Sequence, residues 1–457
     1  MKYDTIAAIS TARGKGGVAM IRISGDEALS VAKRVFRSSA FEKGVEPRKC
    51  YYGTIIRENV AIDDVTLTYF KAPSSYTGED VCEICCHGGL YVTQAVLELV
   101  LSNGAKMAGA GEFTKRAYIN GKLTLSRAEA VGAVIDATND AQLRLSSSLM
   151  RGTLSNKLTD IKATMLELIA RAYASIDYPD EDIEDTDRDD FVGALSKIKN
   201  ELLSLKKSYR ATRAVTEGVK AVIIGRPNAG KSSLYNLLSG KSLAIVTSIA
   251  GTTRDVIENT VSVGDVTLCL ADTAGIRETD DEVEKIGVVR AKERLSEAEL
   301  VLPVFDASEK ENDEDHFILD SASEKSAIAI INKCDKGRKM SQSFENEIKE
   351  KIKRVVYISA ETGEGVDDLA NNLRTMYALD EIDISNDAVV ANARQLSSVT
   401  VALEGVENAE SELLLGATPD IVCFSLEKAL SELEMIDATM ITEQIVDRIF
   451  SRFCVGK

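Results

Sequence analysis

The feature that most constrains this chain is the segment Gly225–Ser232, which reads Gly-Arg-Pro-Asn-Ala-Gly-Lys-Ser. The apolar run Val222–Ile224 precedes it, and an amphipathic pattern with Leu234 and Leu238 follows it. A glycine-rich loop between a strand and a helix is typical of a P-loop, whose backbone N–H groups and helix N-terminus bind phosphates. The sequence therefore predicts a nucleotide site and an α/β fold around it.

The side chains of this loop have separate predicted roles. Lys231 is expected to reach the β- and γ-phosphates, and the Ser232 hydroxyl to ligate Mg²⁺. Thr253 lies in the segment Gly251–Asp255, which is expected to be a mobile switch. Its hydroxyl is expected to complete the Mg²⁺ shell.

Three further motifs follow predicted strands in the order of a GTPase. In the first, Asp272 to Gly275, the Asp272 carboxylate is expected to reach Mg²⁺ through water. The Gly275 N–H is expected to bind the γ-phosphate. The Asp335 carboxylate can accept N1–H and N2–H of guanine, which adenine does not offer, so the base is predicted to be guanine. Ser359 to Glu361 suit a backbone contact to guanine O6. From these motifs the predicted GTP-binding residues are Asn228, Ala229, Gly230, Lys231, Ser232, Ser233, Gly251, Thr252, Thr253, Asp272, Thr273, Ala274, Gly275, Asn332, Lys333, Cys334, Asp335, Ser359, Ala360 and Glu361.

The group that orients the attacking water is not the one used by Ras-type GTPases. Ile276 follows Gly275, at the position where those enzymes place a glutamine, and isoleucine cannot orient water. The acids of the segment 280–284 are the candidates. Arg254, Arg277 or a metal ion can stand in for an arginine finger.

The apolar pattern divides the chain into three kinds of segment. Residues 1–120 mix short strands with short helices, and the run Val81 to Cys86 is one of the strands. Residues 121–217 and 379–457 have helical spacing, whereas 218–378 has continuous apolar strands of a mostly parallel sheet. We predict one helical domain in two segments with the P-loop domain inserted. The helical stripes are Leu154, Leu158, Ile161, Met165, Leu168, Ile169 and Ala172, then Leu195, Ile198, Leu202 and Leu205, and then Ile421, Phe424, Leu426, Leu430 and Leu433.

Composition limits the class of protein. A chain of 457 residues is expected to hold about three domains. No apolar run approaches the ~18 residues of a membrane span, and the N-terminus lacks a signal core, so we expect a cytoplasmic protein with no membrane contact. The net charge is −17, but residues 1–122 carry 16 basic and 13 acidic side chains, a net +3. A nucleic-acid partner would therefore need a local basic patch or a helper protein.

Several segments together resemble one family, the tRNA-modifying GTPase MnmE (TrmE) family. The P-loop and the stretch 244–255 carry the resemblance in the centre of the chain, and 16–25, 76–80 and 111–117 match the family's folate-binding N-terminal domain. The C-terminal Phe453–Lys457, which reads Phe-Cys-Val-Gly-Lys, is the most specific part because ordinary GTPases lack it. The resemblance covers essentially the whole chain.

The resemblance implies an architecture and a reaction. It implies a folate-binding α/β N-terminal domain (1–120), a helical domain in two segments (121–217 and 379–457) and an inserted Ras-like GTPase domain (218–378). It implies a homodimer and a heterotetramer with the FAD-dependent MnmG (GidA) protein. Together such proteins install an aminomethyl or carboxymethylaminomethyl group on C5 of the tRNA wobble uridine. The one-carbon donor is a 5-formyl- or 5,10-methylene-tetrahydrofolate.

The resemblance also implies roles for single residues. Asn228 would ligate K⁺, with oxygens from Thr247, Ile249 and Thr252, so that the ion replaces an arginine finger. Thr247, Ser248, Ile249 and Ala250 would also belong to the GTP-binding residues. Glu284 would orient the attacking water, and Cys454 would serve the tRNA chemistry. The implied folate-binding residues are Arg22, Glu79, Lys122 and Lys457.

Other interpretations stay open beside these. The chain can be a regulatory or assembly GTPase that binds RNA or the ribosome without tRNA chemistry, or a folate-binding structural module with a vestigial GTPase. Arg22 and Glu79 can be an ordinary ion pair. The three cysteines and the histidine of Cys82–His87 are compatible with a metal site. However, Cys82 and Cys86 are expected on one face of a strand and Cys85 on the other, so we expect these cysteines to be small core residues. The acidic run 180–190 is expected to be a solvated loop rather than a calcium site.

Overall fold

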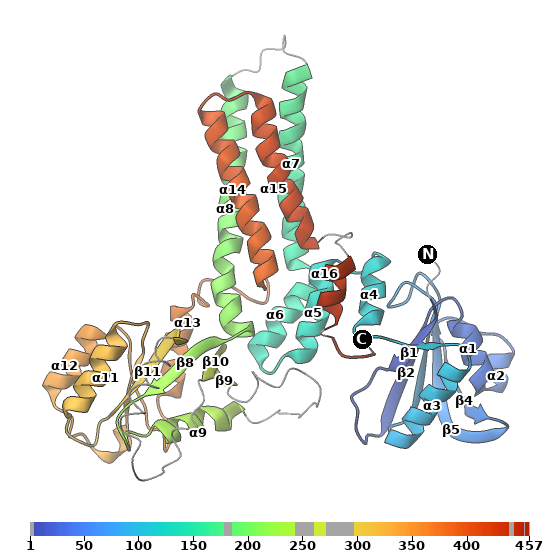
Figure 1. The fold of residues 1–457 in the computed structure, drawn as a ribbon, viewed down its shortest axis with the longest axis horizontal. Coiled ribbons are helices and arrows are strands. Elements are labelled where there is room, and N and C mark those ends of the chain that lie inside the picture. Colours follow the sequence, from blue (N-terminus) through green and yellow to red (C-terminus); the bar gives the residue numbers. More distant parts are fainter. Residues whose placement is uncertain are drawn as a thin grey trace. The chain divides into compact units, whose positions relative to one another are not determined.

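The protein's computed structural model describes residues 4–177, 185–242, 260–270, 297–437, 443–451 and 453–456. The chain separates into two compact units (Figure 1). Unit 1 contains residues 1–132 and 434–457, and unit 2 contains residues 133–433. Both ends of the chain therefore belong to unit 1.

Unit 1 is built on a seven-stranded sheet with the order β3-β4-β5-β6-β2-β1-β7. Neighbouring strands are antiparallel except β1 and β7, which are parallel. Its strands are β1 (Ile6–Ile9), β2 (Val18–Ser24), β3 (Phe36–Arg37), β4 (Cys50–Arg57), β5 (Val60–Phe70), β6 (Val81–His87) and β7 (Lys106–Met107). Its helices are α1 (Ala28–Val35), α2 (Ser39–Glu42), α3 (Leu90–Ser102), α4 (Glu112–Ile119), α5 (Leu125–Asp136, which runs past residue 132) and α16 (Glu443–Phe450).

One face of this sheet forms the core of unit 1. Alternate residues of β2 and β6, such as Ile21 and Ile84, pack with Val31 of α1 and Val96 of α3. Because side chains alternate along a strand, Cys82 and Cys86 join this core, as the sequence predicts. Cys85 points to the other face and is half-buried.

A second, smaller core joins the two ends of unit 1. Tyr118 at the end of α4 and Leu125 in α5 pack against Val446 and Phe450 of α16. A Cβ on Gly132 would lie 3.1 Å from the ring of Phe453, so the absence of a side chain lets that ring pack against α5. The chain's last turn is therefore part of the core of its first unit.

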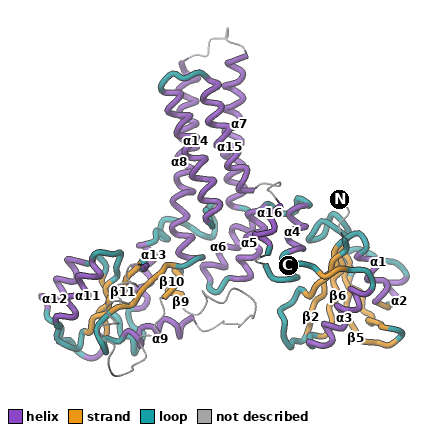
Figure 2. The backbone as a smooth tube through the Cα atoms, in the orientation of Figure 1, coloured by secondary structure: helices purple, strands orange, loops and turns teal. Residues whose placement is uncertain are grey.

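Unit 2 contains a helical bundle that the chain builds from two separated segments (Figure 2). Tyr173 on α7 donates a hydrogen bond of 2.8 Å to Glu427 on α15, and Lys199 on α8 forms an ion pair with Glu410 on α14. The bundle confirms that the sheet domain is inserted into one helical domain. Its helices are α6 (Asp140–Arg151), α7 (Thr153–Asp177), α8 (Asp185–Thr216), α14 (Ala393–Leu414) and α15 (Pro419–Asp437).

The predicted stripes of the bundle agree with the structure except at one place. All seven apolar residues predicted for α7 and all four for α8 are buried. On α15, however, Ile421 and Phe424 are 46% and 70% exposed, while Val422 and Leu426 are buried. The prediction for Ile421 and Phe424 was wrong. Ile421 and the adjacent Val422 are both apolar, so the spacing of apolar residues does not decide which of them is buried.

The inserted part of unit 2 is a six-stranded sheet with the order β13-β12-β11-β8-β10-β9. All neighbours are parallel except β9 and β10, which confirms the predicted mostly parallel fold. Its strands are β8 (Val219–Ile224), β9 (Thr260–Val263), β10 (Val266–Leu270), β11 (Leu300–Asp306), β12 (Ala329–Asn332) and β13 (Val355–Tyr357). Its helices are α9 (Lys231–Ser242), α11 (Asp313–Ser323), the 3-10 turn η2 (Cys334–Lys336), α12 (Gln342–Lys351) and α13 (Val366–Met376).

Glu345 on α12 is a buried charge at the edge of this sheet, with a side chain only 4% exposed. Burial alone would raise the pKa of its carboxyl, but hydrogen bonds from Lys349, Tyr357 and Arg338 lower that pKa to about 2. The carboxylate is therefore ionised and ties α12 to β13. None of the helices that the structure describes is both long enough and apolar enough to span a bilayer.

Candidate nucleotide site

The predicted P-loop lies at the carboxyl end of β8, which is flanked by parallel β10 and β11. Asn228 and Gly230 have left-handed φ angles of 61° and 96°, so the backbone curls before α9 begins. Such a curl turns successive N–H groups inward and forms an anion-binding hollow. A Cβ on Gly230 would lie 2.1 Å from Asn332 Nδ2, so this position accepts only glycine.

Lys231 is held by the loop that precedes it. Its Nζ donates hydrogen bonds of 2.7 Å to the carbonyls of Gly225 and Arg226. Burial lowers the pKa of its ammonium group, and the charge of Glu314 opposes this shift. Two of its three N–H donors are thus engaged, which leaves one for a phosphate oxygen.

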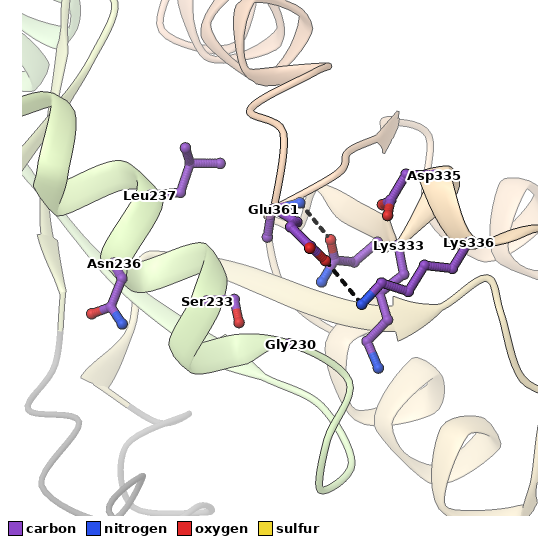
Figure 3. Close-up of a pocket in the computed structure, with 10 residues that line it drawn as sticks. Gly230, Ser233, Asn236, Leu237, Lys333, Asp335, Lys336 and Glu361 are labelled. Carbon is purple, nitrogen blue, oxygen red and sulfur yellow. Dashed lines mark hydrogen bonds and ion pairs between the residues drawn. The ribbon is translucent and has the colours of Figure 1, made fainter.

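A cavity of about 480 Å³ opens beside the P-loop at the same edge of the sheet (Figure 3). Its walls come from α9, from the turn after β12 and from the loop after β13. Lys336 and Glu361 form an ion pair of 2.9 Å at its rim. The lining residues are Gly230, Ser233, Asn236, Leu237, Asn332, Lys333, Asp335, Lys336, Ala360 and Glu361.

Asn332 joins the three walls of this cavity. Its Nδ2 donates a 2.9 Å hydrogen bond to the carbonyl of Ala229, and its Oδ1 accepts one of 3.0 Å from the N–H of Ala360. The residue is 1% exposed. The P-loop and the loop after β13 are therefore fixed to one another through a single buried amide.

Lys333 and Asp335 present their charges on opposite sides of this turn. Lys333 has a left-handed φ of 61°, and its Nζ lies 2.6 Å from the buried Asp306 carboxylate at the end of β11. Burial would raise the pKa of Asp306, but hydrogen bonds from Lys333 and Ser308 outweigh it and lower that pKa. A hydrogen bond from Ser359 lowers the pKa of the exposed Asp335 carboxyl. Asp335 is thus ionised at neutral pH, as an acceptor for guanine N–H groups must be.

The structure brings together the predicted residues of the P-loop, the turn after β12 and the loop after β13. Cys334 is exposed, and its Sγ–H points to the Ile331 carbonyl at 3.2 Å. Another set of predicted residues lies outside the described residues: Thr247, Ser248, Ile249, Ala250, Gly251, Thr252, Thr253, Asp272, Thr273, Ala274, Gly275, Glu284 and Lys457.

The side chains available for metal ions at this site are oxygen donors. Ser232 follows Lys231 at the start of α9 and is exposed, and a hydroxyl there is a ligand that Mg²⁺ accepts beside phosphate oxygens. The side-chain amide of Asn228 is also exposed at the loop, and its oxygen suits an alkali cation. Within the described ranges no group of three or more His, Cys, Asp and Glu side chains is close enough to hold a metal.

A second group of predicted residues lies in unit 1. Arg22 and Glu79 are not paired with one another, which corrects that alternative. Arg22 forms an ion pair of 2.8 Å with Glu83, and its guanidinium lies 5.2 Å from the ring centre of Tyr76. Glu79 pairs at 3.1 Å with the buried Arg116 instead.

The remaining unit 1 residues lie close by in the fold. Glu79 accepts a hydrogen bond of 2.6 Å from Ser24 at the end of β2. Lys122 donates one of 3.1 Å to the Pro73 carbonyl. Arg116 is not among the predicted folate-binding residues. The signals that could have found it are its place in the segment 111–117 and its spacing from Glu112.

The C-terminal tail lies against the end of β1. Val455 bridges to Ala110, and Ser10 Oγ donates a hydrogen bond of 2.9 Å to the Gly456 carbonyl. Gly456 has a left-handed φ of 98°, and a Cβ there would lie 2.1 Å from the Ile9 carbonyl oxygen. Cys454 is exposed beside this contact. The thiol is therefore accessible on an ordered segment.

Comparison with known proteins identifies the relatives of the chain. A family model described as "MnmE helical domain" matches residues 125–454, and one described as "GTP-binding protein TrmE N-terminus" matches residues 5–122. Proteins named "tRNA modification GTPase MnmE" match over the full length of both chains. Those of Acetivibrio thermocellus and Bacillus cytotoxicus are 40% and 38% identical and cover 100% of this chain and of themselves. That of Clostridioides difficile is 40% identical and covers 99% of each.

Solved structures match the chain over shorter stretches. An Era variant of Aquifex aeolicus bound to GDP and AlF₄⁻ is 28% identical and covers 41% of this chain and 66% of its own, with a TM-score of 0.27. The G domain of the T. maritima FeoB iron transporter is 24% identical and covers 35% of this chain and 98% of its own, with a TM-score of 0.25.

Proposed function

This chain belongs to the MnmE family of tRNA modification GTPases, and we propose that it binds GTP with Mg²⁺ and hydrolyses it in the course of modifying tRNA. The observation that supports this most is the convergence of three segments on one cavity (Figure 3). Lys231 stands at the phosphate side, Asp335 at the base side, and the buried Asn332 ties them together. Parallel α/β sheets bind ligands at this carboxyl edge.

Guanine specificity is assigned to the turn after β12. Asp335 is held ionised by Ser359, so it accepts both N–H groups on the guanine edge. An adenine would present an unprotonated ring nitrogen to the same carboxylate and lose both hydrogen bonds. Lys333 covers the base with its aliphatic stem while its charge is neutralised by Asp306.

Hydrolysis is assigned to charge stabilisation around the phosphates. Lys231 contributes its free N–H to the β- and γ-phosphate oxygens, and Glu284 orients the attacking water. Ser232 and Thr253 would hold Mg²⁺, and Asn228, Thr247, Ile249 and Thr252 would hold K⁺. Such a cation would supply the positive charge that an arginine finger supplies in other GTPases.

We place the one-carbon chemistry in unit 1. Arg22, Glu79 and Lys122 bind a tetrahydrofolate derivative together with Lys457, and Cys454 takes part in the reaction on C5 of the wobble uridine. The order of the tail supports a role for Cys454, because Gly456 and Val455 fix the segment beside the sheet. The working assembly is a homodimer joined to the FAD-dependent MnmG protein, in the cytoplasm. The proposed domains are 1–120, 121–217, 218–378 and 379–457.

The first experiment compares steady-state GTP hydrolysis by the full chain in K⁺ and in Na⁺ at equal ionic strength. We expect K⁺ to stimulate hydrolysis strongly and Asn228→Ala to remove the stimulation. Asn346→Ala removes an exposed amide from α12 and is the matched control. Equal slow rates in both salts would remove the K⁺ site from the proposal and leave GTP binding standing.

A deletion of residues 453–457 separates this proposal from a regulatory or assembly GTPase. The deletion should leave GTP hydrolysis intact and abolish wobble-uridine modification in a strain that lacks the chromosomal gene. A strain that retains full modification with the truncated chain would contradict the role of Cys454.

A further inference from the structure

Arg226, the second residue of the P-loop, has a charged side chain that is only 10% exposed. Its Nη2 lies 2.9 Å from a carboxylate oxygen of Glu309, and its Nε lies 3.6 Å from one of Asp315. Arg226 is not among the residues that line the nucleotide cavity. Its side chain instead joins the P-loop to the segment that follows β11.

Asp315 is the partner of Arg226 that most needs a counter-charge, because its carboxylate is buried. It is the third residue of α11, and its side chain accepts a 3.1 Å hydrogen bond from the Asn312 N–H in a capping box. The side chain is 3% exposed, and its Oδ1 has no hydrogen-bond partner in the described part of the chain. Burial raises the pKa of this carboxyl, while the Asn312 N–H and the Arg226 charge oppose the shift. A buried carboxylate of this kind needs a fixed counter-charge.

The backbone carbonyl of Arg226, unlike its side chain, contacts Lys231. Its carbonyl accepts one of the two hydrogen bonds that hold Lys231 Nζ, at 2.7 Å, and also one of 3.3 Å from the Ala229 N–H. The orientation of this carbonyl decides where the Lys231 ammonium points. A continuous path of contacts therefore runs from α11 through Arg226 to Lys231.

We propose that Arg226 is a positioning residue for GTP hydrolysis, which acts by anchoring the P-loop to Asp315 and Glu309 so that the Arg226 carbonyl aims Lys231 at the phosphates. This inference rests on the proposed GTP site, because it assigns Lys231 to the β- and γ-phosphates. It predicts a loss confined to ligands that carry a β-phosphate. A residue that merely stabilised the domain would affect every ligand of the cavity equally.

The test uses the full chain and measures binding of GDP and GMP by competition, steady-state GTP hydrolysis and thermal unfolding. Arg226→Met keeps the apolar stem and removes the fork of donors. We expect GDP affinity and kcat/KM for GTP each to fall about tenfold, the equivalent of about 1.4 kcal/mol, with GMP affinity within about twofold of the parent. Arg226→Lys keeps the charge and should recover part of the loss. Arg338→Met breaks another arginine–glutamate pair in the same sheet domain and is the matched control.

The double variant Arg226→Met with Asp315→Asn separates positioning from stability. Asp315→Asn removes the buried carboxylate that Arg226→Met would leave without a counter-charge. The unfolding temperature should therefore return toward that of the parent. We expect the GDP defect to remain, because the anchor is still missing. Recovery of GDP affinity together with stability would overturn the proposal, as would equal losses for GMP and GDP.

The two proposals fail in different ways. A parent chain that neither binds GDP nor hydrolyses GTP would end the proposed function. A parent chain that does both, with an Arg226→Met variant that matches it, would end only the positioning role of Arg226.

Discussion

Asn332→Asp is the sharpest perturbation that the site offers. The two side chains have the same shape, so the change replaces the Nδ2 donor with an acceptor and adds a negative charge when the new carboxyl is ionised. That atom lies 2.9 Å from the Ala229 carbonyl in a site that is 1% exposed. The variant would therefore bring two acceptors together at a buried contact, while the bond from the Ala360 N–H is kept.

The expected cost follows from the groups involved. A lost neutral hydrogen bond costs about 1 kcal/mol, and a buried carbonyl without a donor costs about 1–3 kcal/mol more. If the cost falls on nucleotide binding, roughly 2–4 kcal/mol weakens GDP affinity by roughly 30- to 700-fold. The defect should shrink at lower pH, because burial beside a carbonyl raises the pKa of the new carboxyl, and its protonated form can again donate to Ala229.

The assay is equilibrium titration of a fluorescent GDP analogue at pH 7.5 and pH 5.5. Asn372→Asp is the matched control, since Asn372 Nδ2 also donates a 2.9 Å bond to a carbonyl, that of Asp368, but this bond is exposed to solvent on α13. Its effect should stay within about 0.5 kcal/mol. The reasoning is refuted if the two variants bind GDP equally well at pH 7.5, or if the Asn332→Asp defect does not change with pH.

Two further predictions concern stability and the tail. The pKa of Glu345 falls from 4.5 to about 2 on folding, so its charge contributes up to about 3 kcal/mol above pH 4.5, and this is lost as the pH falls toward 2. Denaturant unfolding should show a loss of that size for Glu345→Gln at pH 7, less at pH 3, and little for the exposed Glu350→Gln. Gly456→Ala should abolish most tRNA modification but leave GTP hydrolysis within about twofold, because its Cβ meets the Ile9 carbonyl and strain is local. Gly416 also has a left-handed φ, of 77°, but lies in open space, so Gly416→Ala is the control. Unchanged modification in both variants would contradict the role of the tail contact.

The inserted sheet was the part of the fold that could be predicted in most detail. Most of its strands are nearly continuous apolar runs because they are buried on both faces, and Leu300–Asp306 is buried at every residue. The edge strand β9 alternates in burial and was not predicted. The hairpin of β4 and β5 was not predicted. Its residues alternate between the core and the open face, and Asp63 and Asp64 lie within the strand β5, so the apolar signal is weak.

The site was predictable where one motif supplies both the backbone and the side chain. Gly230 and Asn332 belong to such motifs. The partners of Arg22 and Arg226 were not predictable, because they depend on strand register and helix placement. Arg22 meets Glu83 because β2 and β6 pair with those residues opposite one another, and Arg226 meets Asp315 because α11 returns beside the P-loop. Neither relation is visible in a window of sequence.

The packing of Phe450 against Tyr118 has a consequence for synthesis on the ribosome. The first part of unit 1 ends at residue 132, yet α16, which completes its second core, is synthesised only after about 300 intervening residues. At ~5–20 residues per second, that interval is roughly 15–60 s. Throughout it, the apolar surface around Tyr118 and Leu125 lacks its natural cover, and a nascent chain in that state is a substrate for chaperones. Unit 1 thus completes its core only after the whole inserted part of the chain has been made.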